Sequence, residues 1–190
     1  ATMIDDNFYH CDYIFLCAPV AYNTAYLKQI KEYLDDDCIL TDVGSVKTNI
    51  HKEVQALGIG QYFIGGHPMT GSEKSGFLNS KAMLIENAYY VLTPTKEISS
   101  EKVKRYEAFV SELRAIPIIL DYQVHDYVTG TISHLPHIIA STLVNFVRDT
   151  DTKDELMKNL AAGGFKDITR IASSSPTMWQ HILIKNKENV

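Results

Sequence analysis

The sequence predicts an α/β domain built on a parallel sheet, followed by an all-helical region. Between residues 12 and 120, short apolar runs alternate with amphipathic segments. This alternation is typical of strand–helix–strand units with right-handed crossovers. After Asp121 the strand-like runs stop, and a long, mostly apolar helical segment begins at Asp126. We therefore expect two domains, residues 1–121 and residues 122–190.

The α/β part is predicted from where each apolar run begins and ends. In chain order we expect a strand over Asp12–Ala18, a helix over Tyr22–Leu34, a strand from Cys38 that runs into a Gly-Ser turn before Lys47, a helix over Thr48–Leu57, a strand that ends at Ile64, a strand over Asn87–Pro94, a helix over Ser99–Ala115 and a strand over Ile116–Leu120. Pro117 has no amide proton, which favours an edge position for the last strand. Ligands of parallel sheets sit at the carboxyl ends of the strands.

The helical region begins with one segment that is apolar around most of its circumference. We expect a helix over Asp126–Val147, either central to a helical domain or shared between subunits. Shorter helices are expected over Lys153–Leu160 and Phe165–Ala172, and Ser173–Pro176 is a turn or the N-cap of a last helix.

Composition excludes several classes of protein. The 190 residues carry a net charge of −5, which argues against a nucleic-acid partner. No apolar run approaches the ~20 residues of a membrane span, and we expect no membrane association. Three cysteines without metal-type spacing fit a reducing cytoplasm, and we expect Cys17 and Cys38 to be buried thiols.

A glycine-rich segment, Gly65–Gly76, holds the first candidate functional residue. It contains four glycines, one proline and His67, a composition that favours a loop at a strand end over a strand. The imidazole of His67 titrates near neutral pH and suits proton transfer. A lone histidine in such a segment more often caps a turn, so the function of His67 depends on further polar segments.

Two such segments follow. In Ser133–His137, the histidines His134 and His137 are three residues apart and can share one face of a helix. Three interpretations are open: the two histidines are bonded to backbone in the core, they bind a metal, or they face a polar substrate. The segment has neither the glutamate nor the histidine spacing of a zinc-protease motif, so no metal is expected. Arg170 pairs with Asp167 on the surface or binds a carboxylate in bidentate fashion.

Four segments together resemble the motifs of the prephenate/arogenate dehydrogenase family, in the family's order and at about its spacing. They are Asp42–Lys47, Gly65–Gly76, Ser133–His137 and Gly163–Ala172. The resemblance implies that residues 1–121 are the C-terminal part of a Rossmann-type dinucleotide-binding domain and that residues 122–190 are a helical substrate and dimerisation domain. Members begin with a Gly-x-Gly-x-x-Gly turn for the cofactor pyrophosphate. The chain contains no such turn, so we expect that an N-terminal portion is missing, that the helical domain is truncated, and that these 190 residues alone bind the cofactor poorly.

The resemblance implies oxidative decarboxylation of prephenate to 4-hydroxyphenylpyruvate in tyrosine biosynthesis, with NAD, or NADP, as hydride acceptor. It implies that His67 accepts the proton of the ring hydroxyl with help from Ser45, and that Arg170 holds the ring carboxylate. Further substrate-site residues would be His137, His134, Gly163 and Thr70, in a loop shaped also by Met69, Glu73 and Ser75; residues near the cofactor would be Ala18, Pro19, Val20, Thr24, Ser45 and Val46. A homodimer through the helical domain is also implied.

Three alternatives stay open. The substrate could be arogenate, which differs from prephenate only in its side chain. A 3-hydroxy-acid dehydrogenase of the same two-domain plan usually carries a lysine on its long helix, and no lysine lies between Asp126 and Val147. The chain could also be a catalytically incompetent dimerising fragment.

Overall fold

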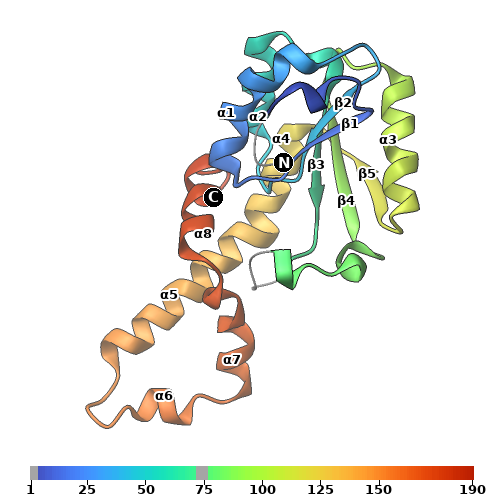
Figure 1. Cartoon of the computed structure of the whole chain (residues 1–190). Coiled ribbons are helices and arrows are strands. Elements are labelled where there is room, and N and C mark those ends of the chain that lie inside the picture. Colours follow the sequence, from blue (N-terminus) through green and yellow to red (C-terminus); the bar gives the residue numbers. More distant parts are fainter. Residues whose placement is uncertain (1–3, 72–76) are drawn as a thin grey trace.

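The computed structural model describes residues 4–71 and 77–190, and its α/β part has one five-stranded sheet. The strands are β1 (Tyr13–Leu16), β2 (Ile39–Asp42), β3 (Phe63–Pro68), β4 (Tyr89–Pro94) and β5 (Ile116–Ile119), and their order in the sheet follows the sequence. Strand β5 lies at one edge, as its proline predicts. The predicted α/β class with a helical C-terminal part is confirmed (Figure 1).

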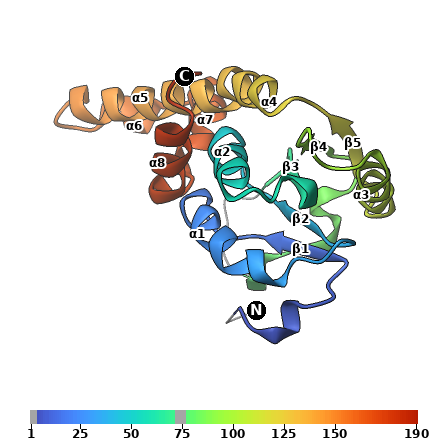
Figure 2. The same ribbon diagram turned by 90° about the horizontal axis from the view of Figure 1, so that it is seen from above.

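Helices cover both faces of this sheet. On one face, α1 (Val20–Ile30) and α2 (Thr48–Leu57) bury Leu27, Ile30 and Val54 against β1 and β2. On the other face, α3 (Ser100–Glu112) packs Tyr106 and Val110 against β2, β3 and β4. Figure 2 shows α1 and α2 on the opposite side of the strands from α3. Successive side chains of a strand point to opposite faces of the sheet. Strand β2 therefore contributes Leu40 to the core under α1 and α2 and Ile39 to the core under α3.

The prediction of a parallel sheet is wrong at one place. Strands β1, β2 and β3 pair in parallel, but β4 runs antiparallel to β3. A parallel connection needs a long crossover, usually a helix. In the described parts of the β3–β4 connection, residues 69–71 and 77–88, the helical structure is limited to two short 3-10 turns, Phe77–Asn79 and Ala82–Ile85. Without a crossover helix the chain returns beside β3 in the opposite direction.

The glycine-rich segment is partly strand rather than loop. Gly65, Gly66, His67 and Pro68 all belong to β3. A Cβ on Gly66 would lie 2.6 Å from the carbonyl oxygen of Asp42, closer than real side chains approach, and 3.0 Å from the ring of Tyr90. Glycine is therefore required here by close packing inside a sheet, a cause that composition alone did not reveal.

The helical region is organised around one long, interrupted helix. Helix α4 (Tyr122–Thr129) continues through a π-helical turn, Gly130–His134, into α5 (Leu135–Thr150). Pro136 lacks the amide proton that would bond four residues back, which is consistent with a local change of helix type at this point. Figure 1 shows α5 leading away from the sheet.

The remaining helices return the chain towards the sheet. They are α6 (Leu156–Leu160), α7 (Gly163–Thr169) and α8 (Pro176–Lys185), which Ser175 caps through its side chain as predicted. The gap expected between the two short helices is present at Ala161 and Ala162, but Gly163 and Gly164 belong to α7 instead of the gap. Cys38 is buried as predicted, whereas Cys17 is exposed just beyond β1. Within the described residues, no helix is long and apolar enough to cross a membrane.

Candidate active site

His67 is the first member of a chain of hydrogen-bonded side chains. It is half-buried at the next-to-last position of β3, near the carboxyl ends of β1 and β2. Its Nδ1 lies 2.8 Å from Nε2 of His125 on α4, and the two rings meet nearly edge to face. One ring nitrogen of His67 is therefore bonded within the protein, and Nε2 is the second.

The chain continues into a buried carboxylate. Nδ1 of His125 lies 2.8 Å from Oδ1 of Asp126, and both side chains are fully buried. The same carboxylate accepts the backbone N–H groups of Lys47 at 2.8 Å and Thr48 at 2.7 Å. Asp126 thus caps α2 from a different helix. Burial alone would raise its pKa, but the hydrogen bonds from His125, Thr48 and Lys47 outweigh burial and lower the pKa.

A buried ion pair ties the ends of β2 and β3 together. The ammonium of Lys47 lies 2.5 Å from Oδ2 of Asp42 and donates to the carbonyl oxygen of Gly66 at 2.6 Å. Burial lowers the pKa of Lys47, and the neighbouring Asp42 carboxylate opposes that change. Because Gly66 directly precedes His67, this lysine fixes the backbone that carries the histidine.

The electrostatic environment keeps His67 neutral. Burial lowers its pKa well below the ordinary value of 6.5, and the neighbouring His125, Lys47 and His134 act in the same direction. At neutral pH the imidazole therefore has one bare nitrogen, as a proton acceptor requires.

The predicted residue His134 is held by the C-terminal end of α8. The side-chain amide of Asn186 donates to the carbonyl oxygen of Asp126 at 2.8 Å and lies 3.0 Å from Nδ1 of His134. Burial lowers the pKa of His134 to about 4. At neutral pH this histidine is therefore uncharged.

The second predicted histidine of this pair, His137, lies against an aromatic ring. It stacks on Trp179 of α8, with ring centroids 3.6 Å apart and nearly parallel planes. Its Nε2 lies 3.4 Å from the hydroxyl of Ser141. Within the described structure, Nδ1 of His137 and Nε1 of Trp179 are buried and form no hydrogen bond of ordinary geometry, although the backbone of Ile171 lies near the His137 ring and opposes the lowering of its pKa by burial. Such atoms are costly to leave unpaired, which marks the stack as a place where a polar ligand or partner would bind.

The other predicted residues are spread around this centre. Ser45 is half-buried in the loop between β2 and Lys47, Thr70 is half-buried just beyond β3, and Arg170 is exposed on the 3-10 turn Arg170–Ser173 that links α7 to α8. Gly163 is exposed, and a Cβ there would meet open space. Of the residues predicted near a cofactor, Ala18, Val20 and Thr24 are half-buried, Pro19 is exposed and Val46 is buried. Glu73 and Ser75 lie outside the described residues.

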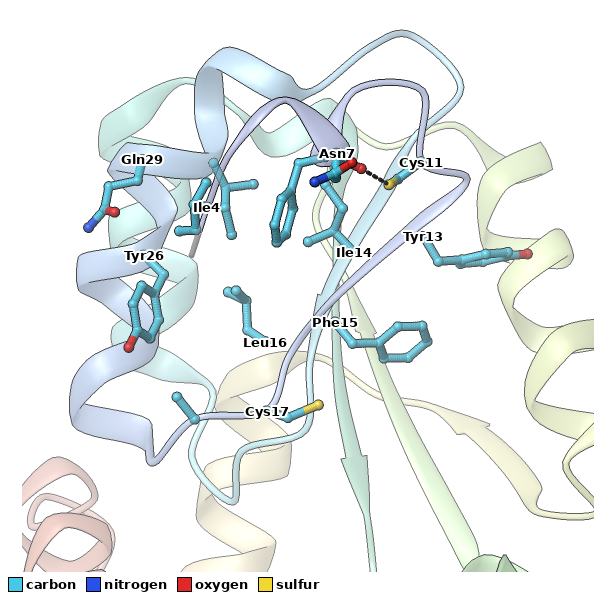
Figure 3. Close-up of a pocket in the computed structure, with 13 residues that line it drawn as sticks. Ile4, Asn7, Cys11, Tyr13, Ile14, Phe15, Leu16, Cys17, Tyr26 and Gln29 are labelled. Carbon is cyan, nitrogen blue, oxygen red and sulfur yellow. Dashed lines mark hydrogen bonds between the residues drawn. The ribbon is translucent and has the colours of Figure 1, made fainter. Parts of the chain in front are cut away.

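A separate apolar cavity lies beside β1, the edge strand of the sheet. It has a volume of about 750 Å³ and lies between the N-terminal segment, β1 and α1 (Figure 3). Ile4, Phe8, Ile14 and Leu16 are among its lining residues. Its lining includes Ala18 but neither His67 nor Ser45, so we assign it no part in the chemistry.

Sequence reasoning missed the residues that support His67. Local pattern identifies Asp126 only as the start of a helix and assigns no role to His125 or Lys47. The only signal was an adjacent His-Asp pair ahead of an apolar helix. Asp126 accepts a hydrogen bond from the amide of Lys47, which is 79 residues away in the chain. Local sequence patterns do not detect contacts over such a separation.

Comparison with known proteins agrees with the motifs. The family model described as prephenate dehydrogenase, nucleotide-binding domain, matches residues 4–119, and the model described as its dimerization domain matches residues 121–190. The chain belongs to the prephenate dehydrogenase family. It is 44% identical over 180 residues to the prephenate dehydrogenase of Lactococcus lactis subsp. cremoris, a match that covers 93% of this chain and 49% of that relative. The chain thus spans about half the length of the curated relatives it matches.

Solved structures of the prephenate dehydrogenase family share its architecture, which is of the Rossmann type. Prephenate dehydrogenase from A. aeolicus, solved with hydroxyphenyl propionate and NAD+, is 37% identical with a TM-score of 0.87, over 94% of this chain and 62% of that one. Arogenate dehydrogenase from Synechocystis is 31% identical with a TM-score of 0.82, over 95% of this chain and 65% of that one.

The described residues fit the nicotinamide end of a dinucleotide. Ala18 and Ser45 follow the carboxyl ends of two neighbouring parallel strands, and Gly44 packs so closely that a Cβ would lie 3.1 Å from a methyl group of Val20. Small side chains and one hydroxyl at this position suit a flat polar ring.

Proposed function

We propose that this chain carries the reaction centre of an NAD-dependent prephenate dehydrogenase. The reaction is the oxidative decarboxylation of prephenate to 4-hydroxyphenylpyruvate, a step of tyrosine biosynthesis. The observation that carries the proposal is the position of His67, neutral at a strand end, with Nδ1 bonded to His125 and with no hydrogen bond from Nε2 to any described residue. NAD, when bound, accepts the hydride from the carbinol carbon of the substrate ring.

In this mechanism His67 accepts a proton while the ring loses a hydride. Nε2 of His67 accepts a hydrogen bond from the ring hydroxyl and takes its proton as carbonyl character develops at the carbinol carbon. The bond to the ring carboxylate then breaks, carbon dioxide leaves, and its electron pair completes the aromatic ring. The phenolic oxygen of the product takes a proton back. Positioning of the substrate against this one base supplies most of what the protein must contribute.

The remaining predicted residues orient the two reactants. Ser45 bonds either the ring hydroxyl or the nicotinamide side, and Ala18, Pro19, Val20, Thr24 and Val46 border the nicotinamide. Arg170 binds the carboxylate that is lost, because a guanidinium is the best bidentate partner for that group. The unpaired nitrogens of His137 and Trp179 supply donors for the substrate's acidic groups. His134, Gly163 and Thr70 complete the substrate side.

A homodimer fits the surface of the helical region. Ile132, Ile139 and Phe146 on the long helix expose 61%, 54% and 62% of their surface, and Leu160 exposes 78%. Apolar surface of this kind is typical of an interface between subunits. The description of the matching family model as a dimerization domain supports the same assignment. The three free cysteines favour a reducing cytoplasm.

Arogenate is the second candidate substrate. The likeness to the Synechocystis arogenate dehydrogenase favours it, and the two substrates share the ring on which His67 acts. Discrimination depends on whether the site meets a keto or an amino group on the side chain. NADP is tested beside NAD as the acceptor.

The test is cofactor reduction by the natural protein that contains this chain, offered prephenate and arogenate separately. We compare wild type with His67→Asn, which keeps a polar side chain of similar reach but cannot act as the base. Turnover should fall by ~10²–10⁴ while substrate affinity is retained. Unchanged turnover in the variant would remove His67 from the mechanism. A folded wild type that reduces neither cofactor with either substrate would refute the proposed activity.

A further inference from the structure

We propose that Asp126, acting through His125, holds His67 in the tautomer whose Nε2 is bare, and that this pair takes up the positive charge when Nε2 accepts a proton. His125 and Asp126 are thus positioning residues for His67. The inference rests on the proposed function for its role in turnover, but its structural half concerns this chain alone.

The direction of each hydrogen bond follows from the carboxylate. Asp126 is ionised because four groups stabilise its charge: the ring of His125, the side chain of Thr48, and the backbone amides of Lys47 and Thr48. An ionised carboxylate only accepts hydrogen bonds, so Nδ1 of His125 carries the proton between them. Neutral His125 then has a bare Nε2, which accepts from Nδ1–H of His67. Neutral His67 consequently presents a bare Nε2.

The alternative arrangement has a charged His125. If His125 carried protons on both nitrogens, it would donate to Nδ1 of His67, whose Nε2 would then be protonated and unable to accept a proton. Two features disfavour that state before the reaction. His125 is fully buried, and the charge of Asp126 is already balanced by two amides at the N-terminus of α2.

The same state becomes favourable after proton transfer. When Nε2 of His67 gains a proton, the proton on its Nδ1 can transfer to Nε2 of His125, which lies 2.8 Å from Nδ1. The positive charge then lies beside Asp126 instead of on His67, and one proton has been added to the pair of rings. Reversal of the two shifts returns that proton to the phenolic oxygen of the product. No further reactant is needed.

The first test reads the tautomer directly. Long-range ¹H–¹⁵N NMR of the histidine rings distinguishes a protonated Nδ1 from a protonated Nε2 in the chain itself. Wild type should show His67 protonated on Nδ1 at neutral pH. A wild-type His67 protonated on Nε2 would overturn the proposal. This readout needs neither substrate nor cofactor, so it separates failure of the tautomer assignment from failure of the proposed activity.

The informative variant is His125→Phe, which keeps the ring shape and removes the acceptor. His67 should lose its preference for Nδ1–H, and turnover should fall roughly 10²-fold with little change in KM. His125→Gln places a carbonyl oxygen where it can accept from Nδ1–H and should restore part of both signals. An unaltered tautomer and full turnover in His125→Phe would refute the proposal.

A matched control separates this effect from loss of a buried histidine. His51 on α2 is also buried, is bonded to Thr93 at 2.9 Å and stacks on Tyr122, and in the described structure it forms no hydrogen bond or ring contact with His67. His51→Phe should leave the tautomer of His67 unchanged, and a change equal to that of His125→Phe would count against the proposal. Asp126→Asn is less informative, because its amide could turn either its oxygen or its nitrogen towards His125.

The pH profile supplies an independent readout. The charged and titratable groups around the pair are Lys47 and Asp42 from the β2–α2 side, His134 from the π-helical turn and Asp126 itself. Because the His125–Asp126 pair takes up the positive charge that His67 gains, removing His125 makes protonation of His67 less favourable. The acid limb of kcat/KM should therefore move to lower pH in His125→Phe and stay in place in His51→Phe.

Discussion

Two groups of histidines in this chain are built in opposite ways. His67, His125 and Asp126 form a continuous chain of hydrogen bonds whose far end is anchored on the backbone of α2. His137 instead stacks on Trp179, and both rings bury a nitrogen that has no partner in the described structure. The first group lies against the sheet, and the second lies where α8 meets α5.

This difference indicates two tasks. A network whose polar atoms are paired within one chain is preorganised, so it can present a proton acceptor before any substrate arrives. Buried nitrogens without partners are unfavourable until something binds them. We therefore expect the His67 group to set the rate and the His137 group to set affinity, and the predictions below test that division from the largest expected effect to the smallest.

The largest effect should be a loss of stability in mild acid. Burial lowers the pKa of both His51 and His134 from 6.5 to about 4. Between those values the unfolded chain binds protons that the folded chain does not, so the free energy of unfolding falls as pH drops from 6.5 to 4 and is unaffected above 6.5. Each histidine should account for about 3 kcal/mol, at 1.36 kcal/mol per pKa unit.

Urea unfolding at a series of pH values measures this effect. His51→Phe should remove only part of the slope between pH 6.5 and 4, because the contributions of His134 and of His67, whose pKa values burial also lowers, remain. Equal stability at pH 7 and pH 5 in wild type would contradict the account of these buried rings as neutral groups.

A smaller effect is expected for Arg170, which belongs to the affinity side of the comparison. Arg170→Ala should weaken substrate binding about 30- to 100-fold, the loss expected for a charged bidentate contact, while kcat changes little. Arg170→Lys should recover only part, since an ammonium cannot bond both carboxylate oxygens in one plane. If steady-state kinetics instead show a fall in kcat with unchanged KM, Arg170 contributes to the rate of the reaction and not to substrate affinity.

The sequence predicted the parts of this site that depend on local pattern. The strand ends, the α/β class and the candidates His67, Ser45, His134, His137 and Arg170 all came from motifs and apolar periodicity, and the roles of these residues stay predictions. Asp126 could not be assigned that way, because its function depends on the amides of Lys47 and Thr48 in another helix.

Two structural errors have the same origin. Glycines 65 and 66 indicated a loop, yet they serve a crowded strand whose neighbours, Asp42 and Tyr90, come from β2 and β4. The direction of β4 was mistaken because alternation of strands with other segments does not report whether the connection contains a helix. In both cases the deciding contact lies between elements distant in sequence.

The smallest effect should come from His137, and it tests the division most directly. His137→Phe keeps the stack on Trp179 but removes the unpaired Nδ1, so affinity should fall only about fivefold, near 1 kcal/mol for one neutral hydrogen bond. Trp179 is the only tryptophan of the chain, so its fluorescence reports binding of a substrate analogue such as hydroxyphenyl propionate. His181→Phe is the matched control, because His181 also buries an unpaired Nδ1 but packs on Tyr22 of α1. Equal losses in both variants would mean that unpaired nitrogens near α8 act through stability, whereas a loss confined to His137→Phe would assign the His137–Trp179 stack to the ligand.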